Sequence, residues 1–388
     1  MKTKIHIWDL PIEKIYVKLK EGFREKIFEG AHKRFGSWVK AGRFFKIKRG
    51  DTALAKNWKM GQYCCPLTII FKISKTLNIS KNEVEKNIKE IKYKTKLDKR
   101  GGNSGRPILD PKLPIIINED FAEILGHICG DGTIIRKNPK KGIKLGYVNS
   151  EPKLIESFQE KIKNVFGDVK ADVQIRDGAR YKRKNFYLQY PSIVSLFILS
   201  VFDYKTGEEM DVPNFIFKMS KKCQCSFLRA LFDDEGTVDI KEKRIVIGLK
   251  PQKPIEQIRN LLIYLKFCPT KIYKSGNILK ISLQKKEDIN LFNRIIGFKH
   301  PIKKRKLNII IKAGWKFDRD INQEFRKKIL LFLRERRSGK TKEIIKYLNK
   351  SPSSTRKYLS KLKNKNLILS RRVRNERSNG WNYLWSLK

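Results

Sequence analysis

In the middle of the chain, stretches whose apolar positions have helical spacing are interspersed with stretches in which apolar and polar residues strictly alternate. The whole succession occurs twice. Between about residues 118 and 310, an apolar stretch with helical spacing precedes two short alternating stretches, a second helical stretch, two more alternating stretches and a closing helical stretch. Helical spacing and strict alternation have different periods, so they indicate different elements. The pattern predicts an α+β core made of two αββαββα units.

Each expected strand and helix of the core has a counterpart in the other unit. The alternating stretches lie at 133–137, 143–150, 172–176 and 184–190 in the first unit, and at 237–243, 244–250, 270–274 and 278–284 in the second. The helices that separate and follow them are expected at 153–167 and 192–202, and at 254–267 and 287–298. The same order at similar spacing indicates an internal duplication.

The segment before the core, residues 1–110, is predicted to be a helical N-terminal domain. Its apolar positions have helical spacing and it shows few strand signals. Two of its helices are expected to meet around residues 77–79, with Ser80 as the N-cap of the second and Glu83 completing a capping box. This arrangement fits a helix-turn-helix, and it fits an ordinary helical hairpin equally well. Residues 96–114, dense in Gly, Pro and charge, are predicted to mark the boundary.

The last segment, residues 320–388, has a pattern of its own. Helical spacing is found at 322–336, 341–349 and 353–366, and two strand-like stretches flank the turn Ser378-Asn379-Gly380. Three helices followed by a hairpin predict a winged helix. From residue 301 to the end there are 27 Lys and Arg against 6 Asp and Glu, a net charge of +21, which favours DNA binding by this domain.

The charge of the whole chain narrows the class of partner. Its 88 Lys and Arg against 39 Asp and Glu give a formal net charge of +49, spread along the chain. A phosphate-bearing partner is expected, because each neutralised phosphate releases condensed counterions. A cationic housekeeping protein, such as a ribosomal component, would also satisfy the charge alone.

Cysteine spacing and the lengths of apolar runs exclude other classes. The six cysteines form no repeated CxxC pattern, and Cys223-Gln-Cys225 is too isolated to predict a zinc site. No apolar run approaches the roughly 18 residues of a membrane span, and the N-terminus lacks the apolar stretch of a signal peptide. We therefore expect a cytoplasmic, nucleoid-associated protein with no membrane partner.

Two short motifs, one in each unit, carry the candidate chemistry. Residues 124–133 have the sequence ILGHICGDGT and residues 228–237 have the sequence LRALFDDEGT. Each predicts an apolar helix with a small residue midway, a carboxylate at its end, and Gly-Thr leading into a strand. Glycine is a common helix stop, which sets the end of each helix.

The two carboxylates, Asp131 and Glu235, stand where a helix normally disfavours them, because its C-terminus is the negative end of the dipole. If Gly126, Gly130 and Ala230 let the two helices approach around a pseudo-two-fold axis, the acids would meet at one end. Close carboxylates repel each other unless cations bridge them. Mg²⁺, with Mn²⁺ as a possible substitute, suits oxygen ligands from carboxylates, water and phosphate, and such a site hydrolyses phosphodiesters. Alternatively, two ordinary apolar helices end in an acid and a glycine.

This pair of motifs resembles the signature of the LAGLIDADG homing endonucleases, over roughly residues 118–310. The resemblance implies a pseudo-two-fold core in which Asp131 and Glu235 are the catalytic, metal-binding acids. It also implies a basic catalytic residue after the last helix of each unit. Lys303 is the candidate in the second unit, with Lys205 as the nearest substitute in the first.

The chain departs from the family pattern at several positions. Glu208 and Glu209 stand where lysine is expected, and Asp234 stands where the family prefers a small residue. Cys129 replaces an aspartate that normally braces the helix end, whereas its counterpart Asp233 is present.

The resemblance further implies that the sheet of each unit lies in the major groove of DNA, with alternate side chains facing the bases. The candidates are Gln174, Arg176, Lys182, Lys184 and Gln189 in the first unit, and Lys241, Lys243, Lys271, Lys274, Lys280 and Gln284 in the second. In the winged helix, the candidates are Arg356, Lys357 and Lys361 on the third helix, and Arg371 and Arg374 on the hairpin.

The sequence therefore predicts a site-specific double-strand DNA endonuclease that acts as a monomer on double-stranded DNA with a long specific site. A transcription regulator that kept the fold and lost cleavage is one alternative, and an RNA maturase is another. Retention of Asp131 and Glu235 favours the enzyme, because a binding protein gains nothing from two carboxylates near phosphate. Met1-Lys2 and Ser386-Leu387-Lys388 lack the residues of protein splicing, so a free-standing protein is expected rather than an intein.

Overall fold

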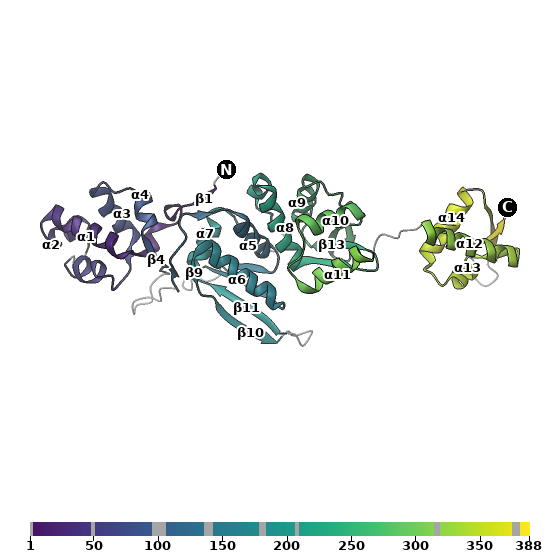
Figure 1. Cartoon of the computed structure of the whole chain (residues 1–388), viewed down its shortest axis with the longest axis horizontal. Helices are drawn as coiled ribbons and strands as arrows, with labels where there is room; N and C mark the ends of the chain where they lie inside the picture. The colour runs from purple at the N-terminus through teal and green to yellow at the C-terminus, as the bar shows by residue number, and fades with distance from the viewer. Residues whose placement is uncertain are drawn as a thin grey trace. The chain divides into compact units, whose positions relative to one another are not determined.

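Both predicted repeats are present in the computed structural model (Figure 1). The first repeat contains α5 (Glu119–Cys129), β7 (Gly132–Ile135), β8 (Lys144–Asn149), α6 (Pro152–Phe166), β10 (Asp172–Asp177), β11 (Lys184–Tyr190) and α7 (Ser192–Leu199). The second contains α8 (Lys221–Glu235), β12 (Gly236–Asp239), β13 (Arg244–Leu249), α9 (Gln252–Tyr264), β14 (Tyr273–Ser275), β15 (Ile278–Leu283) and α10 (Lys286–Ile295). The structure describes residues 3–47, 51–94, 106–135, 143–177, 184–205, 209–313, 319–374 and 381–388.

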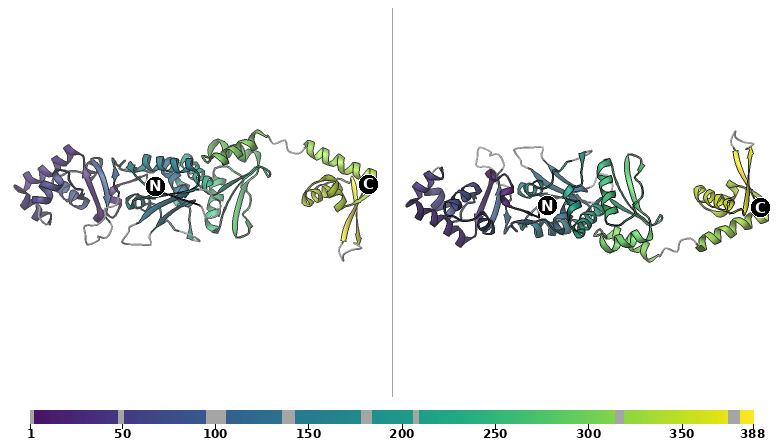
Figure 2. Two further views of the ribbon diagram at one scale, coloured as in Figure 1. Left: turned by 90° about the horizontal axis from the view of Figure 1, so that it is seen from below. Right: turned by 90° about the horizontal axis from the view of Figure 1, so that it is seen from above.

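The two four-stranded sheets have the same topology. Their strand orders are β7-β8-β11-β10 and β12-β13-β15-β14, and all neighbours are antiparallel. One face of each sheet is buried, through residues such as Leu145 and Leu188 in the first repeat and Ile247 and Ile281 in the second. Helices lie along that side of the sheets and leave the other side uncovered (Figure 2). The alternation that predicted the strands thus corresponds to one buried and one uncovered face in each sheet.

The N-terminal part combines the predicted helices with a sheet. It contains α1 (Glu21–Phe35), α2 (Trp38–Phe44), a π-helical segment (Asp51–Lys59), α3 (Leu67–Thr76) and α4 (Lys81–Lys86). The sheet has the order β3-β2-β4-β5-β9, with strands Cys65–Pro66, Ile15–Leu19, Ile88–Tyr93, Ile108–Leu109 and Asp168–Val169. A further short pair joins β1 (Lys4–Ile5) to β6 (Ile115–Ile116). The alternation IYVKL in β2, whose residues Ile15, Val17 and Leu19 are buried, was the strand signal that the helical prediction passed over.

The predicted helix pair around residues 77–79 is present as α3 and α4. Ser80 caps α4, because its side chain accepts a hydrogen bond from the Glu83 backbone N–H at 3.1 Å. The Glu83 carboxylate instead binds the Lys26 ammonium at 2.9 Å. α4 has only six residues and is followed closely by β4.

The chain divides into two compact units, residues 1–312 and 313–388. The predicted boundary near residue 110 falls inside the first unit, where β9 of the core completes the N-terminal sheet. The last helix of this unit is α11 (Pro301–Lys312). In the residues that the structure describes, no helix is both long enough and apolar enough to span a membrane.

The second unit is a winged helix. Its elements are α12 (Arg319–Arg336), β16 (Ser338–Lys340), α13 (Thr341–Leu348), α14 (Pro352–Asn364), β17 (Ile368–Arg374) and β18 (Trp381–Leu387). Its own buried cluster, which includes Phe332, Leu333, Leu359 and Trp385, shows that the unit has a separate hydrophobic core. The three helices and the hairpin are as predicted, and the predicted turn at 378–380 lies outside the described residues.

Candidate active site

Helices α5 and α8 pack directly against each other at the centre of the two repeats. A Cβ atom built on Gly126 would lie 2.3 Å from the carbonyl oxygen of Phe227 and 2.7 Å from the Cβ of Ala230. A Cβ atom on Gly130 would lie 2.6 Å from the Cβ of Asp234. No larger residue fits at these two glycines, so the predicted close approach of the helices is confirmed.

The two motif acids lie at the paired ends of these helices. Asp131 follows Gly130, the C-cap of α5, and Glu235 is the last residue of α8. Loss of solvent raises the pKa of Asp131 to about 7, with help from the charges of Asp234 and Glu235 and against the opposing effect of Lys303. Burial also raises the pKa of Glu235, and Asp234 adds to the effect. The charge of Glu235 therefore contributes to the raised pKa of Asp131.

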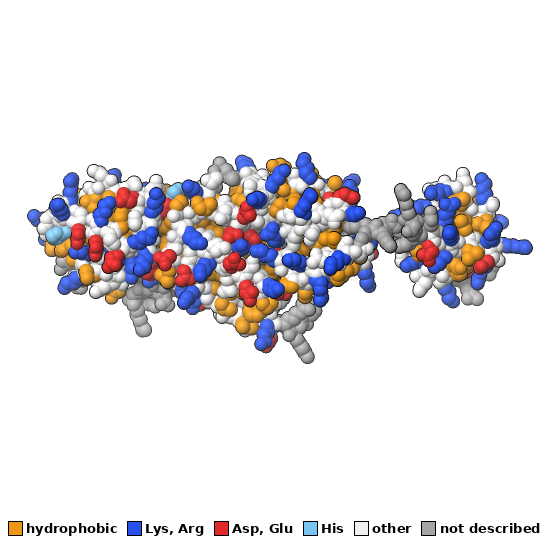
Figure 3. All heavy atoms as spheres, viewed as in Figure 1, with side chains coloured by type: hydrophobic (Ala, Val, Ile, Leu, Met, Phe, Trp, Pro, Cys, Tyr) orange, Lys and Arg blue, Asp and Glu red, His pale blue; other side chains and the backbone are white. Residues whose placement is uncertain are grey.

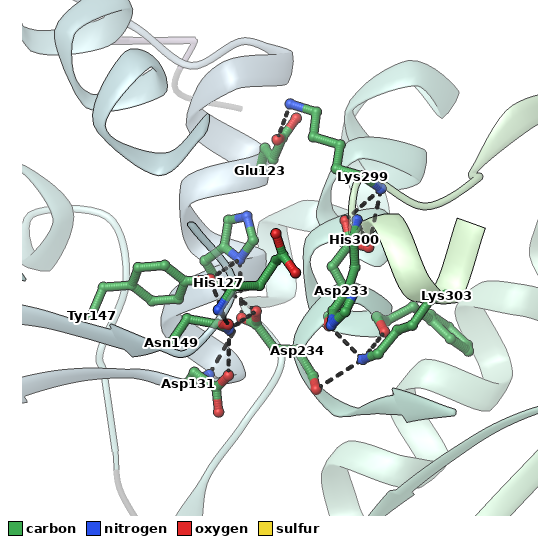
Figure 4. Close-up of polar contacts among 12 residues, drawn as sticks. Glu123, His127, Asp131, Tyr147, Asn149, Asp233, Asp234, Lys299, His300 and Lys303 are labelled. Atoms are coloured by element: carbon green, nitrogen blue, oxygen red, sulfur yellow. Dashed lines mark hydrogen bonds and ion pairs between the residues drawn. The ribbon is translucent and has the colours of Figure 1, made fainter. Parts of the chain in front are cut away.

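Asp234 lies between the repeats and is tied to residues of the first one (Figure 4). Its carboxylate is 3.0 Å from Nδ1 of His127, accepts a hydrogen bond from the Tyr147 hydroxyl at 3.0 Å and accepts another from Asn149 Nδ2 at 3.3 Å. Burial disfavours the charged His127 ring, but Asp234 and neighbouring carboxylates outweigh burial and raise the pKa of His127. Asp234 is therefore a residue that holds the site together.

Asn149 connects this cluster to the first motif acid. Its Nδ2 donates to Oδ2 of Asp131 at 2.9 Å, and its Oδ1 accepts from the backbone N–H of Glu151 at 2.9 Å. The Glu151 contact fixes which end of the amide faces the carboxylates. The amide orientation is thus set by the backbone, and Asn149 acts on Asp131 as a donor.

The sequence prediction missed this cluster, although the chain contained a signal for it. In the strand registers, Gly132 pairs with Tyr147 and Gly236 pairs with Ile247, which aligns the two repeats position by position. On that alignment His127, Tyr147 and Asn149 correspond to Leu231, Ile247 and Leu249. Polar residues in one copy at positions that are apolar in the other would have marked a polar centre on the side of the first repeat.

Asp233 and Glu123 fix other parts of the helix pair. The Asp233 carboxylate accepts hydrogen bonds from the backbone N–H groups of Lys299 and His300 at 3.0–3.1 Å, and burial raises its pKa to about 6 against the effect of these donors. The buried Glu123 of α5 pairs with the ammonium of Lys299 across the repeats. Asp233 thus braces the end of α8, as the resemblance implied.

Lys303 belongs to α11, and its side chain reaches the end of α8. Its ammonium donates to the backbone carbonyl oxygens of Phe232 and Asp234 at 3.1 Å each, and to that of Asp233. Burial lowers the pKa of Lys303 although four surrounding carboxylates favour its charged form. Lys205 is exposed, and among the described residues no hydrogen bond or ion pair joins it to Asp131. The structure therefore brings Lys303, and not Lys205, into contact with the helix ends that carry the acids.

The acid pair fits a hydrated divalent cation. Two carboxylates with raised pKa values, at the solvent-facing end of a helix pair, would be stabilised in their charged form by a cation. Within the described ranges, no group of three or more His, Cys, Asp and Glu side chains is arranged to hold a metal ion by itself. Mg²⁺ commonly keeps water and takes phosphate oxygens as its other ligands, so two carboxylates suffice for it.

The strand register sorts the predicted DNA-binding residues of the first sheet by face. Gln174 pairs with Tyr187, and Arg176 with Asn185, so both lie on the same face as Gln189, which is the uncovered one. Arg176 also lies over the Tyr187 ring, 4.7 Å from its centroid. Lys184 alternates with these residues and lies on the other face, and Lys182 is outside the described residues.

In the second sheet the register separates Lys274 from the other candidates. Lys280 pairs with Gly248 and Tyr273 on the uncovered face, whereas Lys274 pairs with Leu279 on the opposite face. Gln284 donates a hydrogen bond to Ser282, which pairs with Val246 on the uncovered face. The remaining candidates lie in loops, with Lys241 and Lys243 between β12 and β13, and Lys271 before β14.

Basic side chains are exposed on the third helix and on the hairpin of the winged helix. Arg356, Lys357 and Lys361 are exposed on α14, and Arg371 and Arg374 are exposed on β17. In the first unit, Lys and Arg are scattered over the face shown in Figure 3 and do not form a single patch.

Part of the second unit matches a family model. Residues 324–370 match the helix-turn-helix family described as "Bacterial regulatory protein, arsR family". This match covers most of α12 through the start of β17, in agreement with the winged helix seen in the structure.

Part of the chain is similar to solved structures of LAGLIDADG proteins. The homing endonuclease I-WcaI bound to DNA is 18% identical, with a TM-score of 0.38 over 49% of this chain and 87% of its own. I-DmoI with DNA and Ca is 18% identical, with a TM-score of 0.37 over 49% and 97%. The N-terminal LAGLIDADG domain of WhiA is 17% identical, with a TM-score of 0.34 over 46% and 82%.

Curated relatives match only in part. A glutamine–fructose-6-phosphate aminotransferase of Methanocaldococcus jannaschii is 27% identical over 58% of this chain and 20% of its own length. A probable translation initiation factor IF-2 of the same organism is 24% identical over 82% of this chain and 27% of its own length. The chain thus spans about a fifth to a quarter of these relatives, whose named activities are unrelated to each other.

Proposed function

We propose that this protein is a site-specific double-strand DNA endonuclease whose cutting requires a divalent cation, Mg²⁺ or Mn²⁺, at Asp131 and Glu235. The observation that supports the proposal most directly is the pairing of two acids at the ends of α5 and α8, where the glycines leave room for the helices to touch. Both acids belong to one chain, so we propose a monomer as the catalytic unit.

A bound cation would polarise a DNA phosphate and favour deprotonation of the attacking water. The side chains of the chain prepare the site for this chemistry. Asn149 holds the Asp131 carboxylate by a hydrogen bond, and Lys303 places a positive charge beside the end of α8. Positive charge beside the acids stabilises the negative charge that develops on a phosphate under attack.

Sequence recognition is proposed for the uncovered faces of the two sheets. Gln174, Arg176 and Gln189 share that face in the first repeat, as do Lys280 and Gln284 in the second. Arg and Gln side chains can form paired hydrogen bonds with base edges in the major groove, and Lys can bind bases or phosphate. Lys184 and Lys274 face the other way and are left out of the proposed base-reading set.

The test is selection of cleaved sites from a randomised duplex-DNA library, with the wild type, Asp131→Asn, Glu235→Gln and the control Glu156→Gln. Glu156 is an exposed acid on α6 and belongs to neither motif. We expect the wild type and the control to produce one defined double-strand break with Mg²⁺, and each motif variant to lose about a hundredfold or more in rate while still binding DNA. Cutting by both motif variants at the wild-type rate would refute the assignment of the acids.

A DNA-binding regulator is the second candidate, and the match of residues 324–370 to a regulatory family favours it. This reading predicts that the wild type binds one duplex site and cuts it with neither Mg²⁺ nor Mn²⁺. The same selection therefore separates the two functions, because bound and cleaved fractions are recovered independently.

A further inference from the structure

A cationic pocket lies at the end of the helix pair opposite the two acids. Lys221 begins α8 and Glu235 ends it, so the two ends are about 21 Å apart along the helix at ~1.5 Å per residue. The pocket has a volume of about 660 Å³ and is bounded by the beginnings of α5 and α8 and the ends of α9 and α10, which are labelled in Figure 1. It is separate from the proposed catalytic centre.

Basic side chains stand at the start of α8, where a helix ordinarily favours acidic ones. Lys221 and Lys222 occupy the first turn of α8, which contains no acid, and they add positive charge to the positive end of the helix dipole. Ser220 caps the N–H of Cys223, and no described contact satisfies the N–H groups of the two lysines. Such an end is stabilised when an anion binds to it.

Three further basic residues and one acid line the same pocket. Lys266 follows α9, Arg294 belongs to α10 and Arg229 comes from α8 itself, whereas Glu119 is the one carboxylate in the lining. Arg229 is engaged by Glu123 and by the carbonyl oxygen of Ile296. Among the described residues, no ion pair involves Lys221, Lys222, Lys266 or Arg294. Four basic side chains are therefore left to bind an anion.

The inner wall of the pocket is polar at one point and otherwise apolar. Ser226 lines it, is only 4% exposed, and has no hydrogen-bond partner for its hydroxyl among the described residues. Leu265, Leu291 and Ile295 supply apolar surface beside it. A bare phosphate would fill a small part of a cavity of about 660 Å³ and would leave this apolar surface uncovered.

We propose that this pocket binds a nucleoside phosphate, with the phosphate at the start of α8 and the base against the apolar wall. The basic residues match the charge of the phosphate, the buried hydroxyl of Ser226 offers a hydrogen bond to the sugar or base, and the volume is typical of small-ligand sites. The nucleoside phosphate could be a free nucleotide or one residue of a nucleic-acid strand. The proposal does not depend on the endonuclease function.

The test is isothermal titration calorimetry of the full-length Asp131→Asn/Glu235→Gln protein in metal-free buffer. The probes are adenosine monophosphate, adenosine triphosphate, a short oligoadenylate, inorganic phosphate and a poly-glutamate peptide. Lys222→Ala/Arg294→Ala removes two charges from the pocket, and Lys153→Ala/Lys163→Ala removes two exposed lysines of α6 as the matched control. Lys266→Glu is a second, independent pocket variant, and thermal unfolding verifies that every variant is folded.

We expect the adenosine phosphates to bind at least about tenfold more tightly than inorganic phosphate, and each pocket variant to weaken them about tenfold, while the control changes nothing. Tighter binding of the oligoadenylate than of the monophosphate, with the difference lost in both pocket variants, would identify a strand as the source. Equal binding, or a difference that the pocket variants leave unchanged, would identify a free nucleotide. Equal affinity for phosphate and nucleotide, preferential binding of the peptide, or no effect of the pocket variants would each overturn the proposal.

Discussion

At the scale of single residues, the two motif acids are held by different surroundings. Asp131 is bound by Asn149, which is in turn fixed by the Glu151 backbone, whereas Glu235 lies on the side that Lys303 supports. Asp234, placed where a small residue was expected, fits because Gly130 opposite it has no side chain. The departure from the family pattern is thus accommodated by a contact across the repeats.

Neutralising Asp131 should stabilise the metal-free protein at high pH. The folded-state pKa of about 7 lies above the ordinary value of 3.8, so the folded chain binds this proton more tightly and loses stability as pH rises between those values. Asp131→Asn avoids that loss, and we expect a gain of about 1 kcal/mol at pH 8, reduced by solvent around the carboxylate, and almost none near pH 4.

The measurement is thermal unfolding in EDTA at both pH values, with Glu156→Gln as the control. Addition of Mg²⁺ should favour the wild type again, since a cation that binds only the folded acid pair stabilises it. Identical unfolding temperatures of wild type and Asp131→Asn at pH 8 would show that the acids do not strain the fold.

Replacing Asn149 by leucine, the residue at the equivalent position of the second repeat, should slow cutting more than it weakens binding. Leucine is similar in size to asparagine but cannot donate a hydrogen bond to Asp131. Loss of such an orienting contact costs about tenfold to a hundredfold in activity. We expect unequal slowing of the two strands in a nicking assay with separately labelled ends.

The control for this prediction is Asn164→Leu, which removes a comparable contact, to Asp120 on the surface. This prediction rests on the proposed function, so the comparison requires a wild-type protein that cuts DNA. Equal slowing of both strands, with reduced DNA binding, would mean that Asn149 supports the fold and does not position Asp131.

At the scale of elements, the α5–α8 contact decides the geometry of the site. A helix with a small residue midway has many possible partners, and the sequence alone supplied only the expectation that the two motif helices meet. In the structure, the Gly126 backbone touches the backbone of Phe227, and Glu123 and Lys299 form an ion pair that fixes the two repeats together.

Gly126→Ala should therefore be strongly destabilising. Its Cβ would lie 2.3 Å from a backbone oxygen that cannot move away without separating the helices. We expect a loss of about 2–4 kcal/mol in the free energy of unfolding, measured from the urea midpoint of the core transition. Gly22→Ala on α1 is the matched control, because nothing lies within 4 Å of its Cβ and alanine favours a helix by about 0.5–1 kcal/mol. Equal midpoints for both variants would contradict the close contact.

At the scale of the whole molecule, the chain is built from two units with separate cores. The acids, Lys303 and both sheets lie within residues 1–312, and the winged helix lies within residues 313–388. Tethering a second DNA-binding module raises affinity through its effective concentration without changing the chemistry at the first.

Residues 1–312 alone should cut the selected site at the full-length rate when DNA is saturating, but bind it about a hundredfold more weakly. The measurement is a filter-binding titration together with single-turnover cutting of the same duplex. Arg356→Ala/Lys361→Ala in the full chain should reproduce part of the loss, since both side chains are exposed on α14. Unchanged affinity of the truncated protein would show that the winged helix does not bind this DNA.

Much of the architecture was determined by local sequence. The duplicated order of helices and strands, the winged helix and the two motif acids followed from periodicity, turn residues and spacing, because these depend on neighbours in the chain.

What only the tertiary structure decided depends on residues far apart in sequence. Asp234 meets His127 and Tyr147, the Lys303 ammonium binds the end of α8, β9 joins the N-terminal sheet to the core, and register assigns Lys184 and Lys274 to the opposite faces of the sheets from the other strand candidates. Periodicity records which side of an element is apolar, but the identity of the element across the interface is set by packing, and packing is where this site is assembled.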